Sequence, residues 1–164
     1  MTPTVRYQRK HSSSPLAQRI KLVALRLLKI RPRSIFELRQ KLELKGFDTQ
    51  EIEVTIGDLI ASGLLDDRAL TKAFINYRLA RPFGFRRIRQ ELRAKGIDLE
   101  MIEEIILELE EYSPLKVAQE LAERRWQHMP ASLDINKKKK RVTDFLLRRG
   151  FEADIVINVI KKLP

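Results

Sequence analysis

Gly84-Phe-Arg-Arg-Ile-Arg-Gln-Glu-Leu-Arg-Ala-Lys-Gly-Ile97 is the segment that reveals how the chain is built. Its second half, which begins at Arg89, closely matches Arg39-Gln-Lys-Leu-Glu-Leu-Lys-Gly-Phe-Asp48. A fainter copy is Thr143-Asp-Phe-Leu-Leu-Arg-Arg-Gly-Phe-Glu152. The stretch is therefore the middle copy of a repeat that occurs three times along the chain.

The repeat has a period of about 50 residues and a helical pattern. Gly46 and Gly96 are 50 residues apart, and Gly96 and Gly150 are 54 apart. A leucine lies four residues before each glycine, and aliphatic residues lie six and ten after it, as on one face of a helix. With three short helices per copy and no persistent strand pattern, the sequence predicts an all-α, elongated and curved tandem array of three-helix repeats. The repeats are expected over residues 15–63, 64–112 and 113–164.

Capping residues and apolar stripes give the expected helices their ends and their inner faces. Ser34 and Glu37 have the spacing of a capping box, in which each side chain accepts a hydrogen bond from the other residue's amide. Further caps are expected from Asp48 (with Glu51), from Asp66 or Asp67, from Asp98 and from Ser113. Inward-facing side chains are expected among others at Leu16, Ile20, Ile30, Leu38, Leu42, Ile60, Tyr77, Ile88 and Leu92.

The composition is that of a helical protein with no disulfides. The chain has 164 residues and no cysteine, which excludes thiolate chemistry and fits a reducing compartment. No apolar run is long enough to span a bilayer, and no signal peptide is recognisable, so a cytoplasmic location is expected. Residues 1–14 have little to bury and are expected to form a disordered basic arm.

The charge of the chain favours a polyanionic partner. The net charge is +11 and the pI is about 10.1. Basic and acidic segments alternate in step with the repeat: residues 67–97 carry 9 basic and 2 acidic side chains, whereas residues 98–111 carry 7 acidic and no basic ones. The second helix of the middle repeat is therefore expected to be basic and the third acidic.

Arginines of the central stretch are the main binding candidates. Arg86, Arg89 and Arg93 recur at helical spacing, with Ile88 and Leu92 on the other side. Guanidinium groups fork onto phosphate or carboxylate, although a solvated face paired with the acidic helices is the alternative. A second patch of five consecutive charges lies at residues 137–141. The candidate binding residues are Arg78, Arg81, Arg86, Arg87, Arg89, Arg93, Lys95, Lys137, Lys138, Lys139, Lys140, Arg141, Arg148 and Arg149.

Enzyme chemistry finds little support in the sequence. His11 and His128 lie in different contexts, and neither a Walker-type phosphate loop nor a nucleophile elbow is present. The acidic pair Asp66 and Asp67 is more typical of a helix cap than of a cation site. We therefore expect a protein with no catalytic residues, no metal and no cofactor.

Several short motifs together resemble the RecX family, the bacterial regulators of the recombinase RecA. They are Gly63-Leu-Leu-Asp-Asp67, Gly84, Ile88, Glu91-Leu92 and Lys95-Gly96-Ile97, and Phe145-Leu-Leu-Arg-Arg-Gly-Phe151 looks like the third repeat of that family. The resemblance covers residues 16–160. One departure is Leu70, which can fill the core position where the family often has an aromatic residue.

The resemblance implies a fold of tandem three-helix repeats and a non-enzymatic role. It implies binding within the groove of a RecA–DNA filament, where the family restrains strand exchange, ATP hydrolysis and co-protease activity. The partners would be the filament and, weakly and without sequence preference, single- and double-stranded DNA. The protein would act as a monomer and would not bind a membrane. The alternative is a sequence-tolerant DNA-binding protein built from helix-turn-helix-like units. A membrane-surface helix is disfavoured, because the repeat already buries the apolar stripes.

Overall fold

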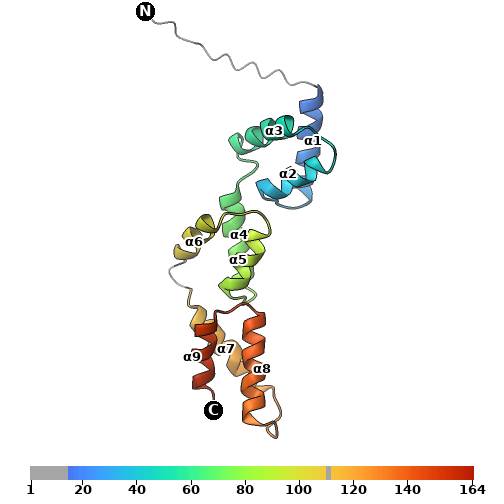
Figure 1. Ribbon diagram of the computed structural model, residues 1–164. Helices are drawn as coiled ribbons and strands as arrows, with labels where there is room; N and C mark the ends of the chain where they lie inside the picture. Colours follow the sequence, from blue (N-terminus) through green and yellow to red (C-terminus); the bar gives the residue numbers. More distant parts are fainter. Residues whose placement is uncertain (1–14, 110–111) are drawn as a thin grey trace, which may run out of the picture. The chain divides into compact units, whose positions relative to one another are not determined.

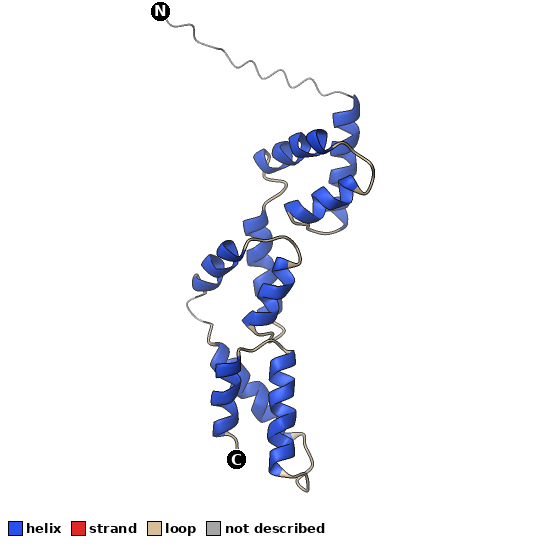
Figure 2. Ribbon diagram, viewed as in Figure 1, coloured by secondary structure: helices blue, strands red, loops and turns tan. Residues whose placement is uncertain are grey.

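The computed structural model describes residues 15–109 and 112–164. Within these residues it contains nine helices and no strand, so the all-α prediction is confirmed (Figures 1 and 2). The helices are α1 (Pro15–Ile30), α2 (Ile35–Glu43), α3 (Thr49–Ala61), α4 (Asp67–Leu79), α5 (Phe85–Arg93), α6 (Leu99–Leu107), α7 (Pro114–Gln127), α8 (Ile135–Arg148) and α9 (Ala153–Lys162). The arm predicted at residues 1–14 lies outside the described residues.

The chain divides into two compact units, Met1–Leu65 and Asp66–Pro164. The first unit contains α1 to α3, and the second contains α4 to α9.

Each set of three consecutive helices has its own apolar core. The first core includes Ile20, Ala24, Leu38, Leu42, Ile52, Ile56, Leu59 and Leu65. The second includes Ile75, Ile88, Leu92, Ile97, Ile102 and Ile105, and the third includes Ala118, Ala122, Val142, Leu146, Phe151, Val156 and Val159. Three separate cores are what a tandem array of three-helix repeats requires.

One glycine ends the second helix of each repeat, and it does so in the same way in all three repeats. Gly46, Gly96 and Gly150 have φ values of +79°, +74° and +86°, in the left-handed region that side chains with a Cβ rarely adopt. In each repeat the amide after the glycine donates to the carbonyl of the leucine four residues before it, at 3.4, 3.2 and 3.2 Å. This arrangement satisfies a carbonyl that the helix itself leaves unpaired. The glycines therefore occupy equivalent turns, as the repeat predicts.

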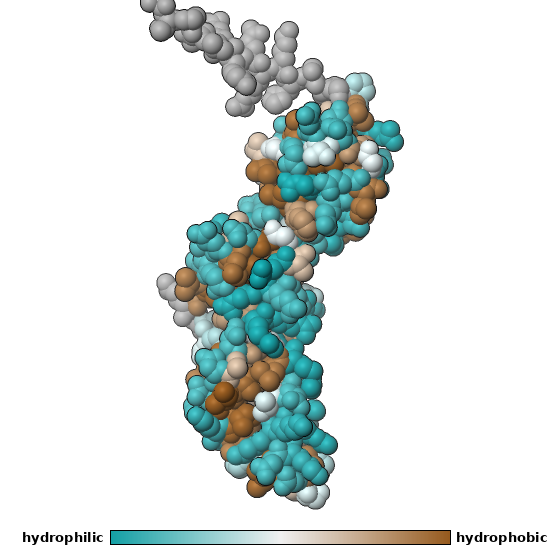
Figure 3. All heavy atoms as spheres, in the orientation of Figure 1, coloured by the Kyte–Doolittle hydropathy of each residue, from teal (hydrophilic) through white to brown (hydrophobic). Residues whose placement is uncertain are grey.

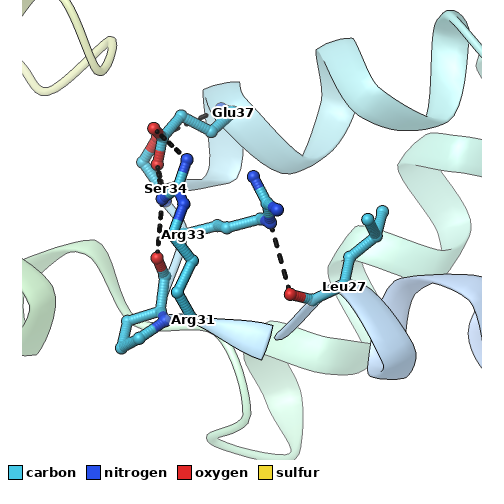
Figure 4. A network of polar contacts seen from close by, with 6 residues as sticks. Leu27, Arg31, Arg33, Ser34 and Glu37 are labelled. Atoms are coloured by element: carbon cyan, nitrogen blue, oxygen red, sulfur yellow. Dashed lines mark hydrogen bonds and ion pairs between the residues drawn. The ribbon is translucent and has the colours of Figure 1, made fainter. Parts of the chain in front are cut away.

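The connection between α1 and α2 is held by a polar network that includes the predicted capping box. The Ser34 hydroxyl accepts from the Glu37 amide at 3.1 Å, and the Glu37 carboxylate accepts from the Ser34 amide at 3.2 Å (Figure 4). Arg31 donates two hydrogen bonds to the same carboxylate, and Arg33 donates to the carbonyl of Leu27. Among the other expected caps, Asp66 accepts from the Ala69 amide and begins α4, whereas Asp98 accepts no hydrogen bond at the start of α6.

Several side chains expected to face inward are exposed. Leu16 and Ile30 lie at the two ends of α1, and Ile30 is 74% exposed. Ile60 and Tyr77 also face solvent. Ala24 and Ile75 are buried next to the expected stripes instead. The predictions for Ile20, Leu38, Leu42, Ile88 and Leu92 are confirmed, since none of these side chains is exposed.

Candidate polyanion-binding surface

Helix α5 carries arginines on one side and begins against the end of α8. Ile88 and Leu92 face the core of the second repeat, which directs the arginines outward. The amide of Gly84 donates to the carbonyl of Arg149 at 2.9 Å, and the amide of Arg86 donates to the carbonyl of Gly150 at 3.1 Å. Two amides that a helix start leaves unpaired thus meet two carbonyls that a helix end leaves unpaired. The positive end of one helix dipole meets the negative end of the other.

Gly84 is the residue that permits this joint between the second and third repeats. A Cβ at position 84 would lie 2.1 Å from the carbonyl oxygen of Gly150, which leaves no room for any other residue. On the other side, a Cβ at Gly150 would lie 2.3 Å from the Cβ of Arg87. In the first repeat Ser34 precedes the second helix at the same distance from the turn glycine, and there a side-chain cap takes the place of the joint.

Glu91 holds two of the predicted arginines. Arg87 Nε donates to Glu91 Oε1 at 2.9 Å. Arg78 Nε lies 2.7 Å from Glu91 Oε2 but out of hydrogen-bonding alignment, so this second contact is an ion pair alone. Arg87 also donates to the carbonyl of Arg148, across the joint. The one acidic side chain within α5 is therefore neutralised by its neighbours.

Arg89 is held by carboxylates from two repeats. It donates to both oxygens of Glu103 on α6, at 2.5 and 3.0 Å, and to Glu152 at 2.8 Å. These bonds raise the pKa of Arg89, chiefly through Glu103, and the same bonds lower the pKa of Glu103. Because its guanidinium is occupied by these partners, Arg89 fastens the third repeat to the second.

Phe83 is a residue of the site that sequence reasoning did not select. The guanidinium groups of Arg78, Arg87 and Arg149 lie 5.2, 4.5 and 5.5 Å from its ring centre. Arg149 also donates to the carbonyls of Arg81 and Pro82, beside the ring. The only signal in the sequence is its place directly before Gly84 in a basic segment. Cations gather on an aromatic face because the ring quadrupole attracts them.

Four predicted arginines have exposed side chains, and so does Gln90, which the sequence analysis did not predict as a site residue. In the part of the chain that the structure describes, the side chains of Gln90, Arg93 and Arg148 are exposed and make no hydrogen bond or ion pair. Arg86 is exposed and donates one hydrogen bond, to the carbonyl of Leu147 at 2.7 Å. Arg81 is exposed and contacts the ring and hydroxyl of Tyr77.

Two open hollows lie beside these side chains. Arg86, Gln90 and Ala94 line both of them. The first, of about 430 Å³, is also lined by Arg87, Glu91, Leu147, Arg148 and Gly150. The second, of about 640 Å³, is also lined by Arg89, Arg93, Leu99 and Glu103. In the space-filling view, hydrophilic residues make up most of the visible face of the second unit, with apolar patches between them (Figure 3).

The basic side chains at the start of α8 differ from one another in their exposure. Lys137, Lys140 and Arg141 are exposed, and Lys139 is half-buried. Lys138 lies 5.5 Å from the centre of the Trp126 ring. Lys95, the remaining candidate, is half-buried with its Nζ 5.7 Å from the centre of the Phe74 ring.

The acidic third helices pair with basic helices of their own repeats. Arg39 on α2 donates to Glu53 on α3, and the equivalent pair in the second repeat is Arg89 with Glu103. Arg68 and Lys72 on α4 pair with Glu108, and Arg68 also pairs with Glu104. The alternative reading of the charge pattern, in which basic faces pair with acidic helices, therefore holds for these residues but not for Arg93 or Arg148.

The described residues offer no metal site and no membrane-spanning helix. They contain no group of three or more metal-ligating side chains, and none of the described helices is long and apolar enough to cross a bilayer. His128 contacts the carbonyl of Arg124 through Nδ1, while His11 lies outside the described residues.

Three separately cored three-helix domains, with a basic surface on the second and third, define a class of tandem helical-repeat proteins. The profile "RecX, first three-helix domain" matches residues 21–59, the second domain matches residues 66–106, and the third matches residues 111–160. The chain belongs to the RecX family.

Relatives named regulatory protein RecX agree with this assignment, and a solved structure shares the fold. The chain is 32% identical to the regulatory protein RecX of Trichlorobacter lovleyi over 143 residues, which cover 86% of this chain and 93% of that protein. It is 36% identical to the regulatory protein RecX of Leptothrix cholodnii over 138 residues, with 84% and 85% covered. The crystal structure of RecX from Lactobacillus salivarius has the same fold, with a TM-score of 0.76, 23% identity, and coverage of 90% and 96%.

Proposed function

We propose that this chain is a non-enzymatic regulator that binds a RecA–DNA filament and inhibits its recombinase, ATPase and co-protease activities. Membership of a family whose proteins are named regulatory protein RecX supports a regulatory role. The observation that carries the proposal is the set of exposed guanidinium groups without internal partners, Arg93 and Arg148 above all. Guanidinium groups bind the phosphates and carboxylates that a filament of protein and DNA presents.

The alternative, a helix-turn-helix DNA reader, is disfavoured by the joint at Gly84. In such proteins the residues near the start of the recognition helix contact base edges in the major groove. Here the start of α5 is covered by the last turn of α8, with Gly84 and Arg86 bonded to its carbonyls. This contact with the third repeat disfavours entry of the start of α5 into a major groove.

The experiment that tests the proposal is a titration of RecA with this protein. DNA-dependent ATP hydrolysis by RecA is expected to fall at protein concentrations well below those that would coat the DNA. An unrelated DNA-dependent helicase serves as the control and is expected to be unaffected over the same range. Inhibition of both enzymes, and only near saturation of the DNA, would instead identify a plain DNA-binding protein.

A further inference from the structure

We propose that Arg86, Gln90 and Arg93 of α5 and Arg148 of α8 form one composite surface for the phosphates of a nucleic-acid strand. The other arginines of the central stretch position this surface and do not contact the ligand. The inference rests on the proposed function, because it names the part of the molecule that meets the DNA of the filament. It divides the basic residues by role, which net charge alone does not.

The four side chains share donors that no internal group satisfies. Gln90, Arg93 and Arg148 make no side-chain hydrogen bond or ion pair within the described part of the chain, and Arg86 donates through one nitrogen only. A guanidinium carries five N–H donors, so Arg86 keeps most of its capacity. Arg87 and Arg89, by contrast, are bonded to carboxylates.

The two carboxylates that line the hollows, Glu91 and Glu103, are both paired with arginines. Glu91 is neutralised by Arg78 and Arg87, and Glu103 is neutralised by Arg89. A nucleic-acid backbone presents charge of one sign and acceptor oxygens at regular intervals, whereas a protein surface presents both signs. The arrangement of charges therefore favours a nucleic-acid strand over a protein as the direct ligand.

The two hollows lie on either side of one helical ridge. Arg86 and Gln90, one turn apart, belong to both hollows, while Arg148 belongs to the first and Arg93 to the second. Neighbouring sites with shared donors suit an anion that repeats along a chain. Successive phosphates of one strand meet that description.

The joint between repeats is what brings Arg148 beside α5. Arg86 donates to the carbonyl of Leu147 and Arg87 to the carbonyl of Arg148, next to the backbone bonds of Gly84. The last turn of α8 is thereby fixed against the first turn of α5. Fixing donors in advance reduces the ordering entropy that binding would otherwise cost.

Removal of the three open arginines from the full-length protein tests the ligand groups. The variant R86Q/R93Q/R148Q is compared with K116Q/K161Q/K162Q, which loses the same charge at exposed lysines of the third repeat. Affinity for a fluorescent oligo-dT strand is measured by anisotropy at several salt concentrations. The arginine variant is expected to bind about tenfold or more weakly, with a salt slope smaller by about 2, since each phosphate contact on a single strand contributes about 0.7. Equal losses in the two variants would overturn the proposal.

Gly84→Ala tests whether the surface is composite, because it keeps every charge and disrupts the joint. Weaker oligo-dT binding with unchanged helicity is the expected result, and wild-type affinity would overturn it. A second variant, Glu152→Ala, covers the case in which Gly84→Ala does not fold. It removes the bond from Arg89 while making the protein more positive, so simple charge attraction demands tighter binding and a composite surface demands weaker binding.

Assaying the same variants against RecA separates this inference from the proposed function. If R86Q/R93Q/R148Q binds oligo-dT normally but no longer inhibits RecA, the surface meets protein carboxylates, and the inference fails while the function stands. If the wild-type protein does not inhibit RecA although the variant loses oligo-dT affinity, the inference stands and the function fails.

Discussion

Arg89 and Arg93 lie one turn apart on α5, yet their environments differ. Arg89 is within reach of Glu103 and Glu152, whereas Arg93 meets neither. Both were predictable from sequence as members of a basic face. That Arg89 is paired and Arg93 is not could not be predicted, because Glu152 is 63 residues away along the chain from Arg89 and only the folded structure brings the two together. The same holds for Phe83, whose stacked arginines include the distant Arg149.

The pair of Arg89 and Glu103 predicts a defined pH dependence of stability. The bonds from Arg89 lower the pKa of Glu103 below its ordinary value of 4.5. A carboxylate whose pKa is lowered by folding stabilises the protein above its unfolded pKa and loses that contribution as the pH falls through the folded pKa. Glu103→Gln is therefore expected to destabilise the protein modestly at neutral pH, and the difference should begin to shrink near pH 4.5 and vanish below the folded pKa of Glu103.

Thermal melts of wild type and Glu103→Gln between neutral pH and pH 3 check this pH dependence. Glu100→Gln is the matched control, since Glu100 lies on the same helix, is exposed, and has no side-chain partner within the described residues. A destabilisation by Glu103→Gln that persists undiminished at pH 3 would contradict the assignment.

Leu92 tests the repeat register at a single position. Its side chain is fully buried, so Leu92→Ala is expected to lower the free energy of unfolding by about 2–5 kcal/mol. Leu44→Ala is the control, because Leu44 is 78% exposed and should change stability by less than about 0.5 kcal/mol. Chemical unfolding of the two variants measures the difference. Equal costs would show that position 92 does not face a core.

At the scale of the element, most helix ends could be predicted because their causes are local. Ser34, Asp66 and the glycine at position 46 act on backbone within a few residues. The ends of α1 were less predictable, since the exposure of Ile30 depends on how α2 and α3 pack against the helix. The joint at Gly84 lay beyond sequence reasoning altogether, because its partner Gly150 belongs to another repeat.

Helix α8 begins unfavourably for its own stability. Its first two turns include Lys137 to Lys140, although the positive end of a helix dipole favours acids. Asp134, whose carboxylate accepts from the Lys137 amide at 3.0 Å, is the compensating group. Asp134→Ala is expected to cost about 0.5–2 kcal/mol.

Asp134→Asn separates the hydrogen bond from the charge at the start of α8. The amide keeps an acceptor oxygen, so its cost should be smaller than that of alanine and should decline with added salt, which screens the charge. Thermal melts at low and high salt measure both variants. A cost for asparagine that does not change with salt would mean that the lysines do not act on this position.

At the scale of the whole molecule, the two compact units are expected to differ in independence. The fragment of residues 66–164 contains two complete cores and the joint between them. It should retain its helical content and melt cooperatively on its own, as measured by circular dichroism. The fragment of residues 15–65 has one small core, and domains of that size are marginal. A fragment 66–164 without a cooperative melt would contradict this division.

The joint between the second and third repeats is built from backbone hydrogen bonds, ion pairs and guanidinium groups, and the described residues form no buried apolar cluster shared by the two. Its opening would therefore expose mainly polar surface. Newly wetted apolar surface raises the heat capacity and polar surface lowers it, and denaturant sensitivity follows the total area exposed. Separation of these repeats should then raise the heat capacity little, and ionic strength should shift it more than temperature does.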